Sequence, residues 1–463
     1  MPGIRTSPPG RWGLFQGPKP LNLKSLGASG QANGDNRAAL LLYRALAAAA
    51  LAAYAPFALL RSLAGGRRLG DLRGRLGFSA VPDLSGGIWI HAVSVGEIGV
   101  ARNLLAALRR VRPDGRAGVS VTTAAGRELA ERAFAADASV FAFPFDLVRP
   151  VERALDAARP GIVLLTETEI WPLFLERAQR RGIPVALVNG RLSERSFRRY
   201  ALARGFMRET LGRLSLLAMQ SAEDARRAVE LGAPAERVIV TGNLKYDLPE
   251  PRPFPDAARL RAAAAGREIV AAGSTAEGED ELVLEAWSRL EPRPLLLLAP
   301  RRPERFETVG RMCVARSLGV TRRSSPVSTG NPAPDVYLLD SIGELASAYR
   351  ESLVAFVGGS LVPRGGQNPI EAWAAGAPAL AGPHMENFRD VAAAGQARGI
   401  LERVADAAGL THAFAAALAA PAVTRDRGAE AARFVAESRG AADRTAAAVL
   451  ALLAAPAARG AAS

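Results

Sequence analysis

Cysteine, histidine and lysine are all scarce in this chain of 463 residues. The single cysteine, Cys313, cannot form an intrachain disulfide, which excludes a disulfide-stapled secreted scaffold. One cysteine and three scattered histidines do not supply a Cys/His zinc site. No Asp-x-Asp, no Gly-x-Gly-x-x-Gly strand–helix turn and no Walker A sequence occurs, so the sequence does not favour a metal site, NAD(P) chemistry or a P-loop.

Basic residues outnumber acidic ones by 59 to 45, a formal net charge of +14, but the excess is unevenly distributed. Residues 1–75 hold eleven Lys and Arg and two Asp and Glu, a net +9, which leaves +5 for the other 388 residues. The excess adjoins the one long apolar stretch, 38–60. This position favours an anionic membrane surface as the partner and argues against nucleic acid.

The basic residues are almost all arginines, and the only lysines are Lys19, Lys24 and Lys245. A compact ammonium kept deep in such a chain suggests a geometry that a planar guanidinium does not fit. Chance retention of one lysine is the alternative interpretation.

The N-terminal region has two parts. Residues 1–36 are rich in Pro, Gly, Ser and Asn, and we expect a disordered leader. Residues 37–78 combine an apolar stretch long enough to cross ~30 Å of hydrocarbon with a basic tail that the positive-inside bias assigns to the cytoplasm. Arg44 lies near the start of the stretch, where it can snorkel. We expect a membrane-anchoring helix, either spanning or interfacial, and a long soluble core helix is the alternative.

From residue 87 onward, short apolar runs alternate with amphipathic helical stretches, as in parallel sheets covered on both faces. The Pro-rich run PEPRPFPD interrupts this alternation and reads as a linker. We expect an α/β protein with two Rossmann-like doubly wound domains, 79–248 and 263–455, joined by a linker at 249–262 and facing a cleft. The predicted strands are Ile88–Ala92, Gly118–Thr122, Val140–Phe143, Ile162–Leu165, Val185–Val188, Leu214–Ala218, Val238–Thr241, Glu268–Ala272, Leu295–Ala299, Val336–Leu339, Leu353–Val357 and Ala379–Ala381.

Carboxylates follow two of the predicted strands of the first domain. In HAVSVGE, Glu97 falls in the first turn of a helix, where it would serve either as a general base or as the partner of Ser94 in a capping box. In TETEIWP, Glu167 and Glu169 are two residues apart and share one face of an extended chain. Both would point into the cleft, and exposed acids at a helix start are the alternative.

Cations follow two further strands of that domain. Arg191 and Arg195 lie in VNGRLSERSF, and their guanidinium groups suit phosphate or carboxylate, although a solvated basic loop has the same composition. Lys245 lies in VTGNLKYD, just before the linker. The ends of these strands are where doubly wound sheets bind ligands.

The second domain adds three segments of the same kind. Ser274 follows one strand, and Pro300 and Arg301 end another. In GGQNPIEAW, Asn368 suits the N-cap of a helix, Pro369 its first position and Glu371 its third. Such a helix start offers free N–H groups to an anion, and Glu371 would accept ribose hydroxyls. A plain, well-capped helix is the alternative.

Six motifs together carry a family resemblance: HAVSVGE, TETEIWP, VNGRLSERSF, TGNLKYD, APRRPERF and GGSLVPRGGQNPIEA. In this order and with compatible spacing, they resemble the 3-deoxy-D-manno-octulosonic acid (Kdo) transferases of lipopolysaccharide synthesis. The resemblance covers roughly residues 40–440 and implies a GT-B fold, two Rossmann-like domains with the active site in the cleft. It also implies a metal-independent, inverting transfer of Kdo from CMP-Kdo to a lipid A precursor at the inner membrane, without a cofactor.

Residue roles carried over by position also belong to the resemblance. Glu97 matches the general base, and Glu167 and Lys245 match residues that stabilise the transition state. The positions that match contacts to CMP are Pro300, Arg301, Ile342, Gly343, Glu344, Asn368, Pro369, Ile370 and Glu371. Expected contacts to the acceptor or to anions are Ser94, Glu169, Arg191, Arg195 and Ser274.

Two other functions fit parts of the same pattern. One is another GT-B enzyme, a transferase or epimerase that uses a UDP-sugar. The other is a membrane-associated scaffold without activity, against which the presence of Glu97, Glu167 and Lys245 together argues.

Overall fold

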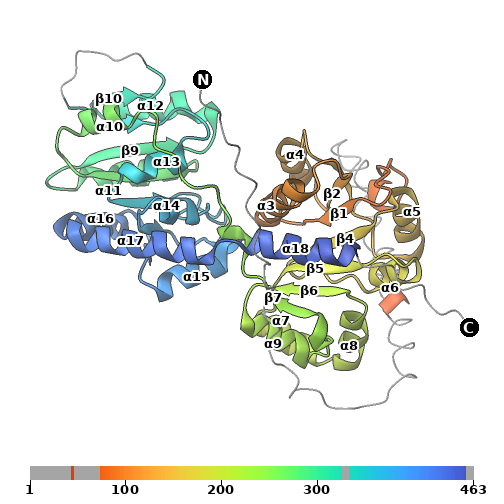
Figure 1. Ribbon diagram of the computed structural model, residues 1–463. Coiled ribbons are helices and arrows are strands. Elements are labelled where there is room, and N and C mark those ends of the chain that lie inside the picture. The colour runs from red at the N-terminus through yellow and green to blue at the C-terminus, as the bar shows by residue number, and fades with distance from the viewer. Residues whose placement is uncertain (1–42, 46–48, 50–72, 326–332, 455–463) are drawn as a thin grey trace, which may run out of the picture. The chain divides into compact units, whose positions relative to one another are not determined.

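The computed structural model describes residues 43–45, 49, 73–325 and 333–454, which form two compact units (Figure 1). Unit 1 holds the described residues up to Leu244 together with those from Gly440, and unit 2 holds Lys245–Arg439. Each unit is built around a parallel sheet of seven strands. The expected leader and most of the expected anchor lie outside the described residues.

The sheet of unit 1 has the order β3-β2-β1-β4-β5-β6-β7, so the chain reverses its direction of winding between β1 and β4. All seven strands were predicted, because most of them are short runs of buried apolar residues, although the edge strands β3 and β7 are only partly buried. Their bounds are β1 Ile88–His91, β2 Ala117–Val121, β3 Ser139–Ala142, β4 Ile162–Thr166, β5 Val185–Gly190, β6 Leu216–Met219 and β7 Val238–Val240.

Helices cover both faces of this sheet and bury two apolar clusters against it. Side chains of α5, α6, α8 and α9 pack in one cluster, and those of α3, α4 and α18 pack in the other. The helices are α3 Val95–Val111, α4 Ala124–Ala133, α5 Val148–Ala158, α6 Pro172–Arg180, α7 Glu194–Ala201, α8 Arg204–Gly212, α9 Ala222–Glu230 and α18 Ala441–Ala454, with short 3-10 turns η2 Ala235–Arg237 and η3 Leu244–Tyr246.

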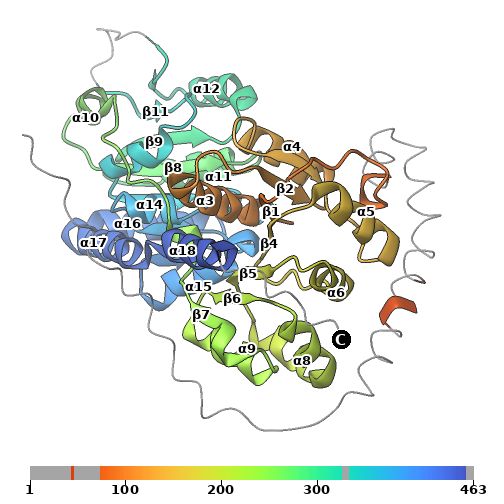
Figure 2. The same ribbon diagram turned by 45° about the vertical axis from the view of Figure 1, so that its right-hand side comes forward.

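The last helix, α18, belongs to unit 1, although the second domain was expected to run to residue 455. Ala441, Ala446 and Val449 of α18 are buried in the cluster formed with α3, and both views show the two helices side by side (Figure 2). Arg444 Nε donates to the Thr241 carbonyl oxygen over 2.9 Å. The chain therefore returns after unit 2 to cover a face of the first sheet.

The sheet of unit 2 has the order β10-β11-β9-β8-β12-β13-β14, with its reversal between β8 and β12. The five predicted strands are present, and the sequence analysis missed the two edge strands β10 and β14, which have three residues each. The bounds are β8 Ile269–Thr275, β9 Leu295–Pro300, β10 Val320–Arg322, β11 Val336–Leu338, β12 Val354–Val357, β13 Ala379–Ala381 and β14 Leu401–Arg403.

The helices of unit 2 bury three apolar clusters. Helix α10 begins inside the range that was expected to be linker, because Phe254 and Leu260 pack into unit 2. The helices are α10 Ala257–Ala264, α11 Glu279–Ser288, α12 Phe306–Ala315, α13 Leu345–Ala348, α14 Ile370–Ala374, α15 Arg389–Ala397, α16 Ala407–Ala419 and α17 Pro421–Ser438, with the turns η4 Pro303–Arg305, η5 Tyr349–Glu351 and η6 Glu386–Phe388.

Within the described residues, no single helix has the length and hydropathy needed to cross a bilayer. The sharply bent pair Ala407–Ala419 and Pro421–Ala454 meets that test of length and composition only when its two parts are taken together.

Candidate active site

The carboxylates of unit 1 lie where its sheet reverses its winding. Glu97 follows β1 and Glu167 follows β4, and these two strands are neighbours, with His91 in register with Leu165. In doubly wound sheets, ligands bind beyond the carboxyl ends of the strands at this reversal. Glu167 directly follows β4, and Glu97 lies in the first turn of α3, the helix that follows β1.

Glu97 is 7% exposed and is held by three hydrogen-bond donors. Its Oε2 accepts from the Val93 backbone N–H over 2.9 Å and from the Thr166 hydroxyl over 2.6 Å, and its Oε1 accepts from the Ser94 hydroxyl over 2.9 Å. Ser94 is also the N-cap of α3, since its Oγ accepts from the Glu97 backbone N–H. Glu97 thus takes part in the cap of α3, and its carboxylate is at the same time buried and held in a fixed orientation.

The pKa of Glu97 is raised, chiefly because burial penalises the charged form, with a smaller contribution from the negative charge of Glu167. The hydrogen bonds from Thr166, Val93 and Ser94 act in the opposite direction and favour the carboxylate. A general base is most effective when its pKa lies near the working pH, and this balance moves Glu97 toward that range.

Glu167 and Glu169 complete a group of three carboxyls. Glu167 has a left-handed backbone with φ of 54°, a strained conformation for this residue type that is often kept at functional sites. Burial and the charges of Glu97 and Glu167 raise the pKa of Glu169 to about 7, while the charge of Arg75 opposes this rise.

His91 is completely buried beneath this group, as expected for a packed core histidine. Its ring stacks on Phe143, and its Nδ1 lies 3.1 Å from both the carbonyl and the hydroxyl oxygen of Ser120. Burial lowers the pKa of His91 to about 3, so the ring is neutral at working pH. Its Nε2 lies 3.9 Å from Glu169 Oε2.

The two predicted arginines of unit 1 differ in position. The Arg191 backbone N–H donates to the Glu167 backbone carbonyl oxygen over 3.4 Å, which places Arg191 beside Glu167. Arg195 is exposed on α7. The sequence analysis did not single out Arg75, whose guanidinium lies 4.1 Å from the centre of the Phe145 ring and whose charge acts on both His91 and Glu169.

Lys245 lies in the turn η3, at the first position of unit 2. The preceding residue, Leu244, is fixed in unit 1, because its N–H donates to Asn189 Oδ1 over 3.0 Å and its carbonyl oxygen accepts from Asn103 Nδ2 over 2.9 Å. The following residue, Tyr246, is buried in unit 2 against Phe434. The backbone on both sides of Lys245 is thus held.

In unit 2, Ser274 lies within β8, which continues to Thr275, rather than after the strand as predicted, and its φ is 54°. Arg301 follows β9, and its backbone N–H donates to the Thr275 carbonyl oxygen over 3.1 Å. Burial and the charge of Arg302 lower the pKa of Arg301, whereas the charge of Glu371 raises it. Arg301 and Glu371 therefore lie near each other. Arg301 also lines a cavity of about 260 Å³ with Thr275, Ala276, Glu277, Arg302, Arg305, Arg364 and Gln367.

The helix after the GGQNP segment differs from the prediction. It begins at Ile370 with Pro369 at its N-cap, one residue later than predicted, and it has only five residues. Asn368 Oδ1 still accepts from the Ile370 backbone N–H over 3.1 Å. Pro369 has helical φ and ψ, and its carbonyl oxygen accepts the first helical bond, from the Trp373 backbone N–H over 3.1 Å. A helix this short has little dipole to offer an anion.

The Ile342-Gly343-Glu344 segment follows β11, the neighbour of β9 in the sheet, but it does not line the 260 Å³ cavity. Ile342 is 66% exposed, and Gly343 has a positive φ of 87°. Glu344 Oε1 accepts from Arg323 over 3.1 Å. Its carboxylate is therefore already paired.

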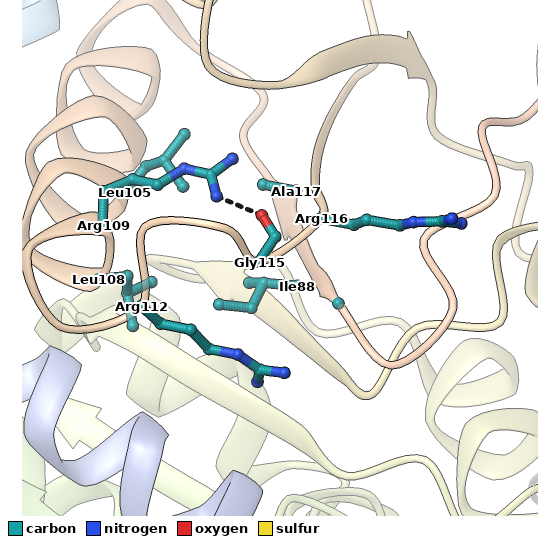
Figure 3. Close-up of a pocket in the computed structure, with 9 residues that line it drawn as sticks. Ile88, Leu105, Leu108, Arg109, Arg112, Gly115, Arg116 and Ala117 are labelled. Carbon is teal, nitrogen blue, oxygen red and sulfur yellow. Dashed lines mark hydrogen bonds between the residues drawn. The ribbon is translucent and has the colours of Figure 1, made fainter.

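Two other features of the described residues do not form a site. A crevice between the amino ends of β1 and β2 has a cavity volume of only about 10 Å³, and Arg109 closes it by donating to the Gly115 carbonyl oxygen (Figure 3). That volume is about one water. In the part of the chain that the structure describes, no three His, Cys, Asp or Glu side chains gather as metal ligands, and Cys313 is buried.

Comparisons with known proteins agree with this arrangement. Residues 70–248 match the family model described as 3-deoxy-D-manno-octulosonic-acid transferase (kdotransferase). A Bordetella pertussis protein named 3-deoxy-D-manno-octulosonic acid transferase is 39% identical over 348 residues, which are 72% of this chain and 80% of that protein. The C-terminal CMP-Kdo binding domain of WaaA from Acinetobacter baumannii shares 32% identity, covering 39% of this chain and 96% of that domain, with a TM-score of 0.36.

A glycosyltransferase from Rickettsia africae has the same fold, with 12% identity, a TM-score of 0.50 and coverage of 80% of this chain and 98% of that one. Together with the two parallel sheets, this likeness defines the fold class as α/β of the GT-B type. Within this fold class, the 39% identity with the Bordetella pertussis protein shows which family the chain belongs to. The chain belongs to the Kdo transferase family of lipopolysaccharide biosynthesis.

Proposed function

We propose that this chain transfers Kdo from CMP-Kdo to a lipid A precursor, with inversion at the anomeric carbon and without a metal or cofactor. The observation that carries the proposal is Glu97, a buried carboxylate with three hydrogen-bond donors at the reversal point of the first sheet. The three hydrogen bonds would fix the orientation of the carboxylate, and its raised pKa suits a general base.

The proposed reaction is a single displacement. Glu97 takes the proton of a sugar hydroxyl on the acceptor while that oxygen forms a bond to the anomeric carbon of Kdo. The bond from this carbon to the phosphate oxygen of CMP breaks, and its electron pair stays on the phosphate. Base removal of a proton is typically worth ~10²–10⁴-fold in rate.

Fixed cations would stabilise the charge that develops on the leaving CMP. Arg301 at the end of β9 and Lys245 in η3 are the residues proposed for this role, and Glu167 is proposed to stabilise the reacting centre. Asn368 and Glu371 would contact the nucleotide through their polar side chains, in place of a helix dipole, whereas Pro369 and Ile370 between them are buried. Arg191 would bind an anionic group of the acceptor, because its backbone is joined to Glu167.

We also propose that the enzyme works at the cytoplasmic face of the inner membrane, held there by the basic N-terminal segment. Two described residues of this segment support its attachment to unit 1. The Tyr43 hydroxyl donates to Asp146 Oδ2 over 2.8 Å, and Arg44 forms a 2.7 Å ion pair with Glu176 of α6. Flotation of the full chain with vesicles tests this location, because binding should require anionic lipid and weaken as salt is added.

The decisive experiment for the reaction is Glu97→Gln. The purified variant should fold and bind CMP but lose transfer when it is incubated with CMP-Kdo and a tetra-acylated lipid A precursor and the products are weighed. Near-wild-type transfer would remove Glu97 as the base. Thermal shifts with CMP and UDP separate the proposal from a UDP-sugar enzyme, since only the cognate nucleotide should stabilise the protein at low concentration.

A further inference from the structure

The 260 Å³ cavity of unit 2 is lined by four arginines and by one acidic side chain, Glu277. The arginines come from two segments: Arg301, Arg302 and Arg305 follow β9, and Arg364 lies in the loop between β12 and α14. Pockets that enclose a whole drug-sized ligand usually measure about 300–1,000 Å³. This cavity therefore fits part of a nucleotide sugar rather than the whole molecule.

Two of these arginines have partners in the structure. Arg305 forms an ion pair with the buried carboxylate of Asp280, and its NH1 donates to the Thr275 carbonyl oxygen over 3.1 Å. Arg301 is held by its backbone and lies near Glu371. Arg305 thus forms a wall of the cavity, and Arg301 is the cation already proposed for the phosphate.

Arg302 and Arg364 are different, because neither guanidinium has a hydrogen bond or an ion pair to another described residue. The charge of Arg302 also lowers the pKa of Arg301, which shows that two like charges are held close together. Arg302 and Arg364 are both exposed at the cavity, so their guanidinium groups are open to an anionic ligand. Paired guanidinium groups match the two oxygens of a carboxylate especially well.

We propose that Arg302 and Arg364 bind the carboxylate of the donor sugar, apart from the phosphate, and so select a sugar acid over a neutral sugar. This inference rests on the proposed function, in which the donor carries two anionic groups, a phosphodiester and the sugar carboxylate. Arg301 takes the first and the pair Arg302 and Arg364 takes the second. The exposed Glu277 at the same cavity faces the hydroxyl groups of the sugar.

The test compares two ligands that differ in the sugar. In Arg302→Gln and Arg364→Gln, the KM for CMP-Kdo should rise about 10- to 100-fold, the usual effect of losing a charge-assisted hydrogen bond. The dissociation constant of CMP, measured by calorimetry, should stay unchanged, because CMP has no sugar carboxylate. The matched control is Arg311→Gln, which removes one exposed arginine of α12 with the same change of charge and should alter neither constant.

Two results would overturn the inference. An equal loss of affinity for CMP and CMP-Kdo would assign Arg302 and Arg364 to the phosphate. An unchanged KM for CMP-Kdo in both variants would mean that the cavity does not hold the donor sugar. Failure of the proposed function is recognised separately, because the unsubstituted enzyme would then not turn over CMP-Kdo at all.

Discussion

The hydroxyl oxygen of Thr166 lies 2.6 Å from Glu97 Oε2 and also 2.8 Å from the backbone carbonyl oxygen of His91. A hydroxyl carries one hydrogen, and the carbonyl can only accept. When Glu97 is ionised, the hydroxyl donates to it. When Glu97 holds a proton, the hydroxyl can accept a hydrogen bond from the carboxyl group and donate to the His91 carbonyl oxygen. Thr166 therefore can form a hydrogen bond with Glu97 in both protonation states of the carboxyl group.

This relationship predicts the effect of Thr166→Val, which keeps the shape but removes the hydroxyl. The carboxylate loses a donor that lowers its pKa, so the pKa of Glu97 should rise further and the acidic limb of the kcat/KM profile should move to higher pH. On that limb, activity should fall about tenfold or more, as for a lost hydrogen bond to a charged group.

Thr166→Ser is the control for this substitution, because it retains the hydroxyl and should keep the limb in place. A uniform loss of activity at every pH in Thr166→Val, without movement of the limb, would show that Thr166 is needed only for packing.

The role of Thr166 illustrates which parts of the site the sequence could not indicate. Glu97 and Glu167 could be placed at strand ends, because apolar runs mark the strands that precede them. The bond between Glu97 and Thr166 joins residues 69 positions apart and depends on the pairing of β1 with β4. Local periodicity contains no information on that pairing.

The fold shows the same division. Twelve of the fourteen strands in the described residues were predicted, since central strands of a parallel sheet are continuous apolar runs. The strands β10 and β14 were missed because they are short edge strands, and Arg322 and Arg403 interrupt their apolar character. The packing of α18 on unit 1 was also missed, because an Ala-rich helix covers either sheet equally well by composition.

Glu169 should make the stability of the protein depend on pH. Its folded-state pKa of about 7 is above the ordinary value of 4.5, so between these values the folded state binds more protons than the unfolded state. The free energy of unfolding contributed by this group therefore falls as pH rises from about 4.5 to about 7 and then stays constant. Glu169→Gln removes this contribution and should gain stability relative to the unsubstituted protein across that window.

Urea unfolding at several pH values from 4.5 to 8, followed for both proteins, measures this difference. Glu128→Gln, an exposed carboxyl on α4, controls for the loss of one negative charge. A stability difference between Glu169→Gln and the unsubstituted protein that does not change with pH would contradict the raised pKa of Glu169.

Lys245→Arg should lose most of its activity, although the positive charge is kept. Leu244 and Tyr246 are both buried, so the backbone cannot shift to fit a longer, planar guanidinium. We expect kcat to fall about 10²-fold or more, as when a group that stabilises developing charge is displaced, while the thermal unfolding midpoint stays the same. Comparison with Lys245→Met separates the loss of position from the loss of charge. Full activity of Lys245→Arg would make the rarity of this lysine accidental.

Glu279 should prove essential to unit 2, although it was not singled out in the sequence. Its buried carboxylate accepts from the backbone N–H groups of Ala276, Gly359, Ser360 and Leu361, at 2.5–2.8 Å. It thereby fixes the start of the loop that leads to Arg364. This loop folds back on itself, because the Gly366 backbone N–H donates to the Gly359 carbonyl oxygen over 2.7 Å.

In Glu279→Gln, an amide N–H₂ group would face backbone N–H groups, which cannot accept its hydrogens. Leaving buried donors unsatisfied costs about 1–3 kcal/mol for each group, so unfolding of unit 2 should need about 3 kcal/mol less free energy. The KM for CMP-Kdo should rise as well, because the loop forms part of the cavity wall. Glu281→Gln, on the exposed side of α11, should change neither quantity. Equal stability of the two variants would show that the loop after β12 does not depend on the Glu279 carboxylate.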